Sequence, residues 1–166
     1  MGTIIQLNTI EGERSNVILS GQMYYFKYIA EPINIYYDKF PLIFVIRKRG
    51  RLIEGINFHY MAIKYRTRLL EDTKPFFDSD EITEDTRLRV KAYRQIILTT
   101  RKYRFARAAI HRYRMENIRS KIIRISPTSW NTAVLQKAEK FVMGAGGKKE
   151  SQRVFRETLL KTKGKQ

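Results

Sequence analysis

The chain has 166 residues, of which 43% are apolar, so it can bury one substantial hydrophobic core. It contains no cysteine, which excludes disulfides, thiol nucleophiles and thiolate zinc sites. With 33 basic and 16 acidic residues, its formal charge of +17 indicates a negatively charged partner.

The first 58 residues predict a small, strongly bent sheet or barrel. Two runs, at residues 23–29 and 42–48, are rich in aromatic and β-branched side chains, as is typical of strands. Arg49-Gly50-Arg51 predicts a turn, after which the chain returns to form a hairpin. Including two shorter segments, the predicted strands are Ile4–Leu7, Val17–Leu19, 23–29, 42–48 and Leu52–Phe58.

Helical spacing begins after Phe58. His59–Glu71 predicts a helix, and residues 71–85 form an acidic linker with Pro75 and seven carboxylates. Ser79 or Thr83 is suited to cap a further helix, in which the apolar residues lie opposite a basic side. That basic side consists of Arg87, Lys91 and Arg94.

The segment from about Arg101 to Asn117 predicts the most sharply divided helix. Its apolar side consists of Phe105, Ala106, Ala109, Ile110 and Tyr113. Its opposite side gathers Arg101, Arg104, Arg107, His111 and Arg114. We therefore expect the guanidinium groups of this segment to project together from one helix face.

The remainder of the chain predicts one strand followed by two helices. Lys121–Ile125 predicts the strand, and Ser126-Pro127 is a typical helix start, with apolar residues recurring from Trp130 to Phe141. Residues 144–147 are glycine-rich and predict a hinge, followed by a short helix at Ser151–Lys161 and a basic tail.

These elements predict an α+β protein, with an N-terminal SH3-like small β-barrel followed by a basic helical C-terminal half. The expected units are a barrel at 1–58, a helical basic region packed on it at 59–143, and a hinge, short helix and basic tail at 144–166. No run is apolar enough for a membrane span or a signal peptide, so we expect a protein that is soluble and not secreted.

The positive charge is concentrated in residues 87–124, which carry +12 of the +17, with arginine outnumbering lysine ten to three. Guanidinium groups match phosphate oxygens with rigid donor pairs, so nucleic acid is the favoured partner. An acidic protein partner and a solvated face without a ligand remain as alternatives. The expected nucleic-acid contacts are Arg87, Lys91, Arg94, Arg101, Arg104, Arg107, His111, Arg114 and Arg119.

Tyrosines cluster around the predicted barrel, where they either stack on unpaired bases or fill a small core with their hydroxyls at its rim. Asp38, Glu54 and His59 are the candidates for catalysis, because they could meet across the barrel. No nucleophile–base spacing, P-loop, dinucleotide fingerprint or metal-ligand cluster accompanies them. We therefore expect neither an enzyme nor a cofactor or metal site, and Asp38 is expected to cap the turn before Phe40-Pro41.

Three sequence runs resemble a functionally uncharacterised family of small proteins from T4-like tailed phages. These are G-Q-M-Y-Y-F-K-Y from Gly21, Y-Y-D-K-F-P-L-I-F-V-I from Tyr36, and G-I-N-F-H-Y from Gly55. The resemblance continues weakly through Ser126, Pro127 and Trp130, and covers about residues 21–160. It implies an SH3-like barrel and a phage origin, and it assigns no activity.

We therefore expect a non-enzymatic phage protein that binds nucleic acid, most simply double-stranded DNA, through arginine-rich helices. One alternative is a virion structural component of the neck, tail, baseplate or capsid, whose basic face contacts proteins or packaged DNA. A weaker alternative is an SH3-like ribonuclease. The expected location is the host cytoplasm or the virion, with no membrane partner and with other virion proteins or an oligomer as further options.

Overall fold

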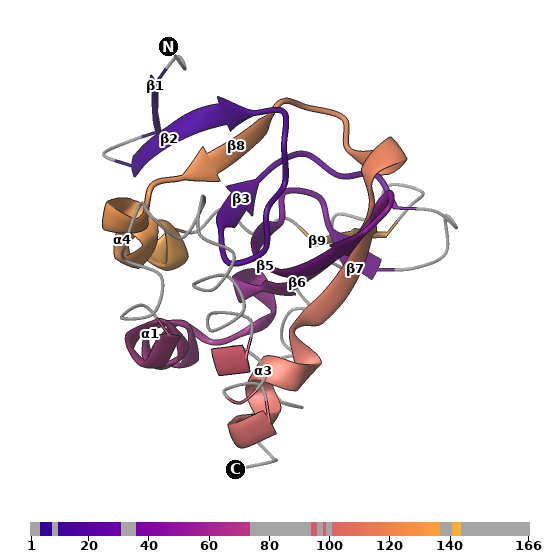
Figure 1. The fold of residues 1–166 in the computed structure, drawn as a ribbon. Helices are drawn as coiled ribbons and strands as arrows, with labels where there is room; N and C mark the ends of the chain where they lie inside the picture. The colour runs from indigo at the N-terminus through magenta and orange to yellow at the C-terminus, as the bar shows by residue number, and fades with distance from the viewer. Residues whose placement is uncertain are drawn as a thin grey trace.

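The computed structural model describes residues 4–7, 10–30, 36–73, 94–95, 98, 101–136 and 141–143. Its main feature is an antiparallel sheet of seven strands (Figure 1). In sheet order these are β1 (Ile4–Leu7), β2 (Ile10–Ser15), β8 (Ile122–Ile125), β3 (Met23–Tyr25), β5 (Leu42–Arg49), β6 (Leu52–Asn57) and β7 (Ile110–Arg114). A separate pair joins β4 (Tyr36–Asp38) to β9 (Phe141–Met143).

Strands from both halves of the chain form the large sheet. β8 lies between β2 and β3, and β7 extends the sheet beyond β6. The described sheet is open, because its edge strands β1 and β7 do not pair with each other. The structure thus confirms a mixed α and β architecture with an antiparallel sheet, but it does not confirm the SH3-like barrel or the basic helical half. The division at residue 58 stays a prediction.

The predicted strand at Val17–Leu19 is wrong, and β2 occupies Ile10–Ser15 instead. The backbone at residues 17–19 bonds to a side chain rather than to a neighbouring strand. The hydroxyl of Tyr24 accepts from the amide of Leu19 at 2.9 Å and donates to the carbonyl of Val17 at 3.4 Å. β2 instead pairs with β8, with Gly12 opposite Ile125. The other strands predicted in the first half are present, although β3 covers only Met23–Tyr25 of the predicted range 23–29.

The predicted helix at 101–117 is also wrong beyond Ala108. Helix α3 (Arg104–Ala108) ends there, and the chain continues as β7. The sequence I-H-R-Y-R alternates apolar or aromatic with charged residues, so it also fits a strand, and β6 offers an unpaired edge. Ile53 and Gly55 of β6 lie opposite Tyr113 and His111 of β7, respectively. Sheet pairing therefore overrides the helical period.

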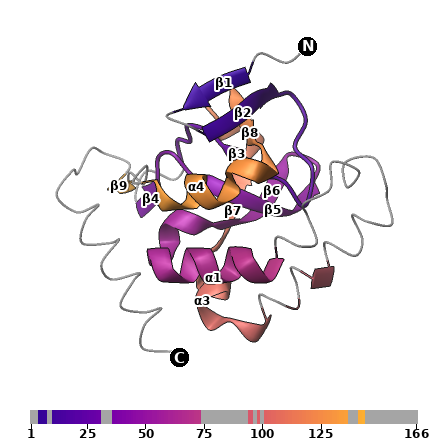
Figure 2. The same ribbon diagram turned by 90° about the vertical axis from the view of Figure 1, so that its left-hand side faces the viewer.

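Two helices cover the same side of the large sheet, α1 (Ile63–Thr73) and α4 (Trp130–Leu135) (Figures 1 and 2). Arg66 joins them, because its buried guanidinium donates to the carbonyl oxygens of Met61 at 2.9 Å and Val134 at 3.0 Å. Three 3-10 turns complete the described helices, at Phe58–Tyr60, Met115–Asn117 and Pro127–Ser129. No helix among the described residues is long and apolar enough to cross a membrane.

The helix expected from Ser126 to Phe141 is shorter than predicted. Pro127 opens a 3-10 turn that leads into α4, as the Ser-Pro signal indicated. Gln136 is extended, with ψ of 138°, and Phe141 lies in β9 instead of a helix. Phe141 is nevertheless buried, because its ring packs edge-on against Tyr60. The hinge, short helix and tail predicted after residue 143 lie outside the described residues.

Side chains from alternate positions of the sheet build two hydrophobic clusters. The larger includes Phe44, Ile56 and Trp130, and the smaller includes Tyr24, Val45 and Ile53. Trp130 is fully buried, donates from Nε1 to the carbonyl of Ile125 at 3.0 Å, and meets Phe44 edge-on. β5 and β6 therefore contribute buried side chains to both clusters, so the sheet is packed on both of its faces at these two strands.

Candidate nucleic-acid interface

The outer ends of β5, β6 and β7 present four arginines on one face of the sheet. The register shifts after Val45, so that Arg47 lies opposite Glu54, and Arg49 lies opposite Leu52. On the other side of β6, Arg112 lies opposite Glu54, and Arg114 lies opposite Leu52. Because side chains two residues apart share a face of a strand, these groups lie together. We call Arg47, Arg49, Arg112 and Arg114 the arginine patch.

Glu54 is the acidic centre of the arginine patch. Its Oε2 accepts from Nη2 of Arg47 at 3.1 Å and from Nε of Arg112 at 3.3 Å. The side chain of Glu54 is 17% exposed, against 34% for Arg47 and 68% for Arg112. Burial raises the pKa of Glu54, but the hydrogen bonds and charges of the two arginines outweigh burial and lower it below the ordinary value. One carboxylate therefore orients two guanidinium groups and leaves the patch strongly positive.

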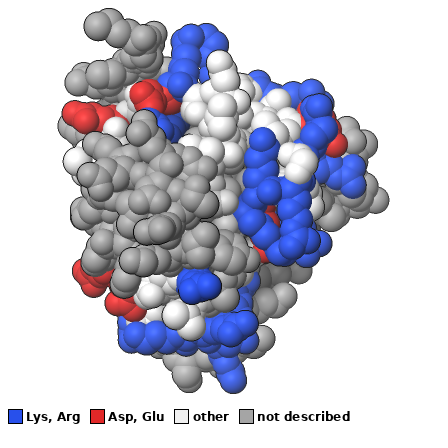
Figure 3. Space-filling model, in the orientation of Figure 1, with Lys and Arg blue, Asp and Glu red and all other residues white. Residues whose placement is uncertain are grey.

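A second basic area surrounds α3. Arg101, Arg104 and Arg107 are exposed, and Nη2 of Arg107 donates to the carbonyl oxygen of Arg101 at 2.9 Å. Figure 3 shows Lys and Arg side chains gathered over the β5–β6–β7 part of the sheet and again at the end of the molecule that α3 forms. β7 follows α3 directly in the chain, and both areas are visible on the face that Figure 3 shows.

The structure divides the residues predicted to contact nucleic acid. Arg104 and Arg107 lie on α3, whereas Arg114 lies on β7, so the three do not share a helix face as expected. Arg94, Arg101 and Arg119 are exposed. Arg87 and Lys91 lie outside the described residues.

His111 does not belong to the exposed basic row in which the helical period placed it. Its ring stacks on Tyr60, with 3.9 Å between ring centroids, and its Nε2 is buried without a hydrogen-bond partner among the described residues. Burial lowers the pKa of His111 to about 4, against a weaker opposing effect of a hydrogen bond to the Ala108 backbone and the charge of Asp38. His111 is therefore neutral at pH 7.

The sequence analysis missed Arg47, Arg49 and Arg112. Their signal was present in the spacing, because R-x-R occurs at Arg47–Arg49 and again at Arg112–Arg114. On a strand this spacing points both arginines to one side. Once residues 110–114 were interpreted as helix, the second pair could not be matched with the first.

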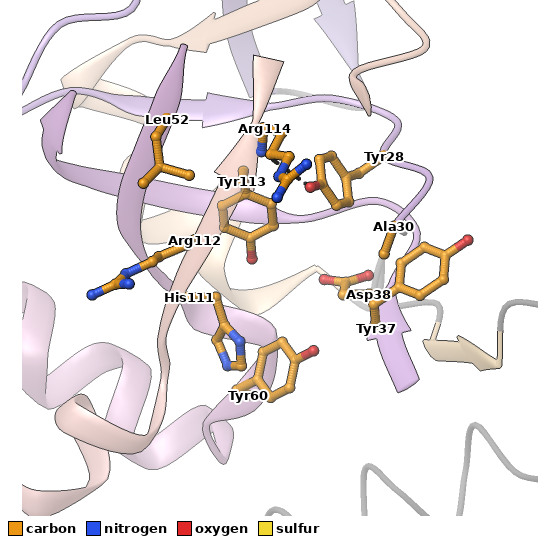
Figure 4. A pocket seen from close by; sticks show the side chains of 10 residues that line it. All are labelled: Tyr28, Ala30, Tyr37, Asp38, Leu52, Tyr60, His111, Arg112, Tyr113 and Arg114. Carbon is orange, nitrogen blue, oxygen red and sulfur yellow. Dashed lines mark hydrogen bonds between the residues drawn. The ribbon is translucent and has the colours of Figure 1, made fainter. Parts of the chain in front are cut away.

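A cavity of about 380 Å³ opens beside the arginine patch (Figure 4). Tyr28, Tyr37, Tyr60 and Tyr113 line it, together with Ala30, Asp38, Leu52, His111, Arg112 and Arg114. Tyr28 meets Tyr37 and Tyr113 edge-on, with ring centroids 6.3 and 5.1 Å apart. Arg114 lies beside Tyr28 in Figure 4, and the Tyr28 hydroxyl accepts from the Arg114 backbone amide at 3.1 Å. The cavity thus has an aromatic interior with one arginine, Arg114, beside it.

The three residues considered for catalysis are not all brought together. Nδ1 of His59 lies 2.5 Å from Oδ2 of Asp38, and both side chains are completely buried, whereas Glu54 belongs to the arginine patch. Oδ2 of Asp38 also accepts from Nδ2 of Asn57 at 3.1 Å, and Oδ1 accepts from the amide of Phe40 at 3.1 Å. The latter bond confirms the predicted capping of the turn. Within the described ranges, no three His, Asp or Glu side chains are grouped to hold a metal ion.

Comparison with known protein families places this geometry in context. The model of the family described as phage T4 terminal DNA protecting protein matches residues 3–158. The chain belongs to this family. The match includes the large sheet, the arginine patch, α3 and the tyrosine-lined cavity. None of the curated proteins and none of the solved structures compared with the chain matches it.

Membership in this family confirms the resemblance to proteins of T4-like phages. The SH3-like barrel that the resemblance implied is not confirmed, since the described sheet is open. The family description names terminal DNA, which is a polyanion of the kind expected from the charge distribution.

Proposed function

We propose that this protein is a non-enzymatic phage protein that binds the ends of double-stranded DNA through the arginine patch and the arginines of α3. The observation that carries the proposal is the gathering of four arginines on one sheet face, two of them bonded to a single carboxylate, in a chain of a terminal DNA protecting family. Its place of action would be the host cytoplasm or the virion, wherever phage DNA has free ends.

The chemistry of the arginine patch suits a phosphate backbone. Guanidinium groups donate pairs of parallel hydrogen bonds to phosphate oxygens and stay charged at any physiological pH. The shared bond to Glu54 holds Arg47 and Arg112 in position before DNA arrives, which reduces the entropy lost on binding. Arg49 and Arg114, which lie opposite Leu52 on either side, extend the positive surface past this pair.

The arginines of α3 provide the second part of the contact surface. Arg104 and Arg107 are exposed at the end of the molecule that leads into β7. A duplex lying along this surface would meet phosphate-binding groups from a helix and from a sheet. The original expectation of arginine-rich helices is therefore kept for α3 and widened to the neighbouring strands.

Salt dependence of binding tests the phosphate contacts. Each contacted phosphate contributes about −0.9 to the slope of log affinity against log salt. Replacing Arg49, Arg112 and Arg114 together by glutamine is expected to flatten the slope for a 30-base-pair duplex by about 2 to 3 units. The variant Arg104→Gln/Arg107→Gln should flatten it by up to about 2 units.

A matched control separates local contacts from net charge. Arg14, Lys64 and Lys121 are exposed on β2, on α1 and just before β8, away from the arginine patch. Their joint change to glutamine removes the same charge and should leave the slope within about half a unit of the native value. Equal effects of the two triple variants would contradict a defined contact surface.

Preference for ends requires a second measurement. The same duplex sequence can be offered as linear DNA or closed at both ends by hairpin loops. We expect tighter binding to the linear form, and slower digestion of that form by an exonuclease in the presence of the protein. Equal affinity for both forms would replace end binding by general duplex binding.

A further inference from the structure

The tyrosine-lined cavity beside the arginine patch differs chemically from the patch itself. Its volume of about 380 Å³ lies in the range of roughly 300–1,000 Å³ that small-molecule sites occupy. Four of its ten lining residues are tyrosines, and a neutral histidine stacked on Tyr60 adds a fifth ring. Arg112 and Arg114 are the basic residues of the lining, but the Arg112 guanidinium points away from the tyrosines and donates to Glu54, whereas Arg114 lies beside Tyr28 (Figure 4). One part of the cavity is therefore cationic and another is aromatic and uncharged.

We propose that this cavity receives an unpaired nucleotide at the DNA end, with its base against Tyr37 and its phosphate at Arg114. The inference rests on the proposed binding of DNA and adds a structural feature of the end that the protein recognises. A nucleotide has the same division as the cavity, an uncharged aromatic base joined to an anionic phosphate. Base stacking on aromatic side chains is the usual way in which proteins hold unpaired bases.

Electrostatics fixes the direction in which the nucleotide enters. Asp38 lines the cavity on the side of β4, and its carboxylate would repel a phosphate there. His111 adds no positive charge at pH 7, because burial holds its pKa near 4. The phosphate therefore belongs at the end of β7, where Arg114 connects the cavity to the arginine patch. Because β7 is an edge strand, the terminal nucleotide of a duplex held on that patch would reach the cavity around this edge of the sheet.

Tyr37 is the side chain best suited to test the cavity. It is half-buried on β4 and contacts Tyr28 edge-on, whereas Tyr28, Tyr60 and Tyr113 are each more than nine-tenths buried and support the core. Tyr37→Ser removes the ring, and Tyr37→Phe keeps it. The matched control is Tyr25→Ser, because Tyr25 is also half-buried but stacks on Phe40 outside the cavity.

The probe is a DNA hairpin with one open end, either blunt or carrying one to three unpaired nucleotides with 2-aminopurine at the first unpaired position. We expect the native protein to bind the overhang form at least about fivefold more tightly than the blunt form, as one stacked base provides. Binding should also quench the 2-aminopurine fluorescence. Tyr37→Ser should lose both effects while binding the blunt form as before, and Tyr37→Phe and Tyr25→Ser should retain them.

The possible results separate this inference from the proposed function. Equal affinity for blunt and overhang ends, with unchanged fluorescence and a steep salt dependence, would overturn the nucleotide site and leave DNA binding intact. Retention of the overhang preference by folded Tyr37→Ser would also overturn it. Absence of binding to every DNA form would overturn both proposals together. Fluorescence of Trp130, the single tryptophan, verifies that each variant is folded.

Discussion

Arg47 and Arg112 donate to the same carboxylate oxygen of Glu54, at 3.1 and 3.3 Å, although they lie on strands on opposite sides of β6. Glu54 thus links β5 and β7 across the middle strand while it neutralises part of the arginine patch. Under the proposed function, a phosphate would compete with this carboxylate for the same two guanidinium groups. If the arginine patch binds DNA as proposed, stability and DNA affinity are opposed at Glu54.

The change Glu54→Gln should raise DNA affinity and lower stability. Removing the competing carboxylate is expected to strengthen duplex binding about three- to tenfold at low salt, measured by fluorescence anisotropy. The free energy of unfolding at pH 7 should fall by about 0.5–1 kcal/mol.

The pH dependence of that stability loss is fixed by the lowered pKa of Glu54. A depressed pKa in the folded state stabilises the protein above the ordinary carboxyl pKa, and this contribution disappears as pH falls through the folded value. Native protein and Glu54→Gln should therefore converge in strongly acidic solution. Glu13→Gln is the control, since Glu13 pairs with Arg124 away from the patch and should not affect DNA affinity. Weaker DNA binding by Glu54→Gln would show that orientation of the arginines outweighs the freed charge.

His111 should make the protein less stable as pH falls from about 6.5 to about 4. The unfolded histidine binds a proton in this window while the buried one does not, so protonation favours unfolding. The change His111→Phe keeps a ring against Tyr60. It should abolish the part of the fall in unfolding free energy that His111 causes across this pH range, which is up to about 3 kcal/mol. Denaturant unfolding followed by Trp130 fluorescence measures the effect. An identical pH profile for the two proteins would mean that His111 has the same pKa in the folded and the unfolded protein.

Asp38 is expected to support the fold and not a reaction. Asp38→Ala would leave His59, Asn57 and the amide of Phe40 without their buried acceptor, at a cost of about 3–5 kcal/mol. Thermal unfolding gives the size of the loss. Incubation of the native protein with DNA and RNA supplies the opposing test, because cleavage that disappears in His59→Ala would establish a nuclease.

We expect that Gly55, inside β6, cannot be replaced by a residue with a side chain without loss of stability. A Cβ at this position would lie 2.9 Å from the carbonyl oxygen of Phe44 and 3.4 Å from Cβ of Ile43. A backbone oxygen in a paired strand cannot move aside, so Gly55→Ala should destabilise the protein by about 1–3 kcal/mol. Because the β5–β6 pairing carries Arg47 and Glu54, DNA affinity should fall as well. A fully stable Gly55→Ala would mean that β5 and β6 can separate locally.

Composition and local patterns determined several features that the structure contains. Aromatic and β-branched runs around Gly50 specified the β5–β6 hairpin, and Gly50 has the positive φ of 56° that its turn requires. The Ser126-Pro127 signal specified the start of a helical segment, and Asp38 specified a capped turn. The charge distribution indicated a polyanion, in agreement with a family named for terminal DNA. Such features depend on neighbours in the sequence, so the sequence reveals them.

Only the tertiary structure decided how the basic residues assemble. Residues 110–114 satisfy both a helical and an alternating period, and they form a strand because they pair with the edge of β6. That choice turned His111 inward onto Tyr60 and set Arg112 and Arg114 beside Arg47 and Arg49. The same pairing formed the opening between β7 and β4 that the tyrosines line. Contacts between strands distant in the chain depend on register and on competition for sheet edges, which no local pattern encodes.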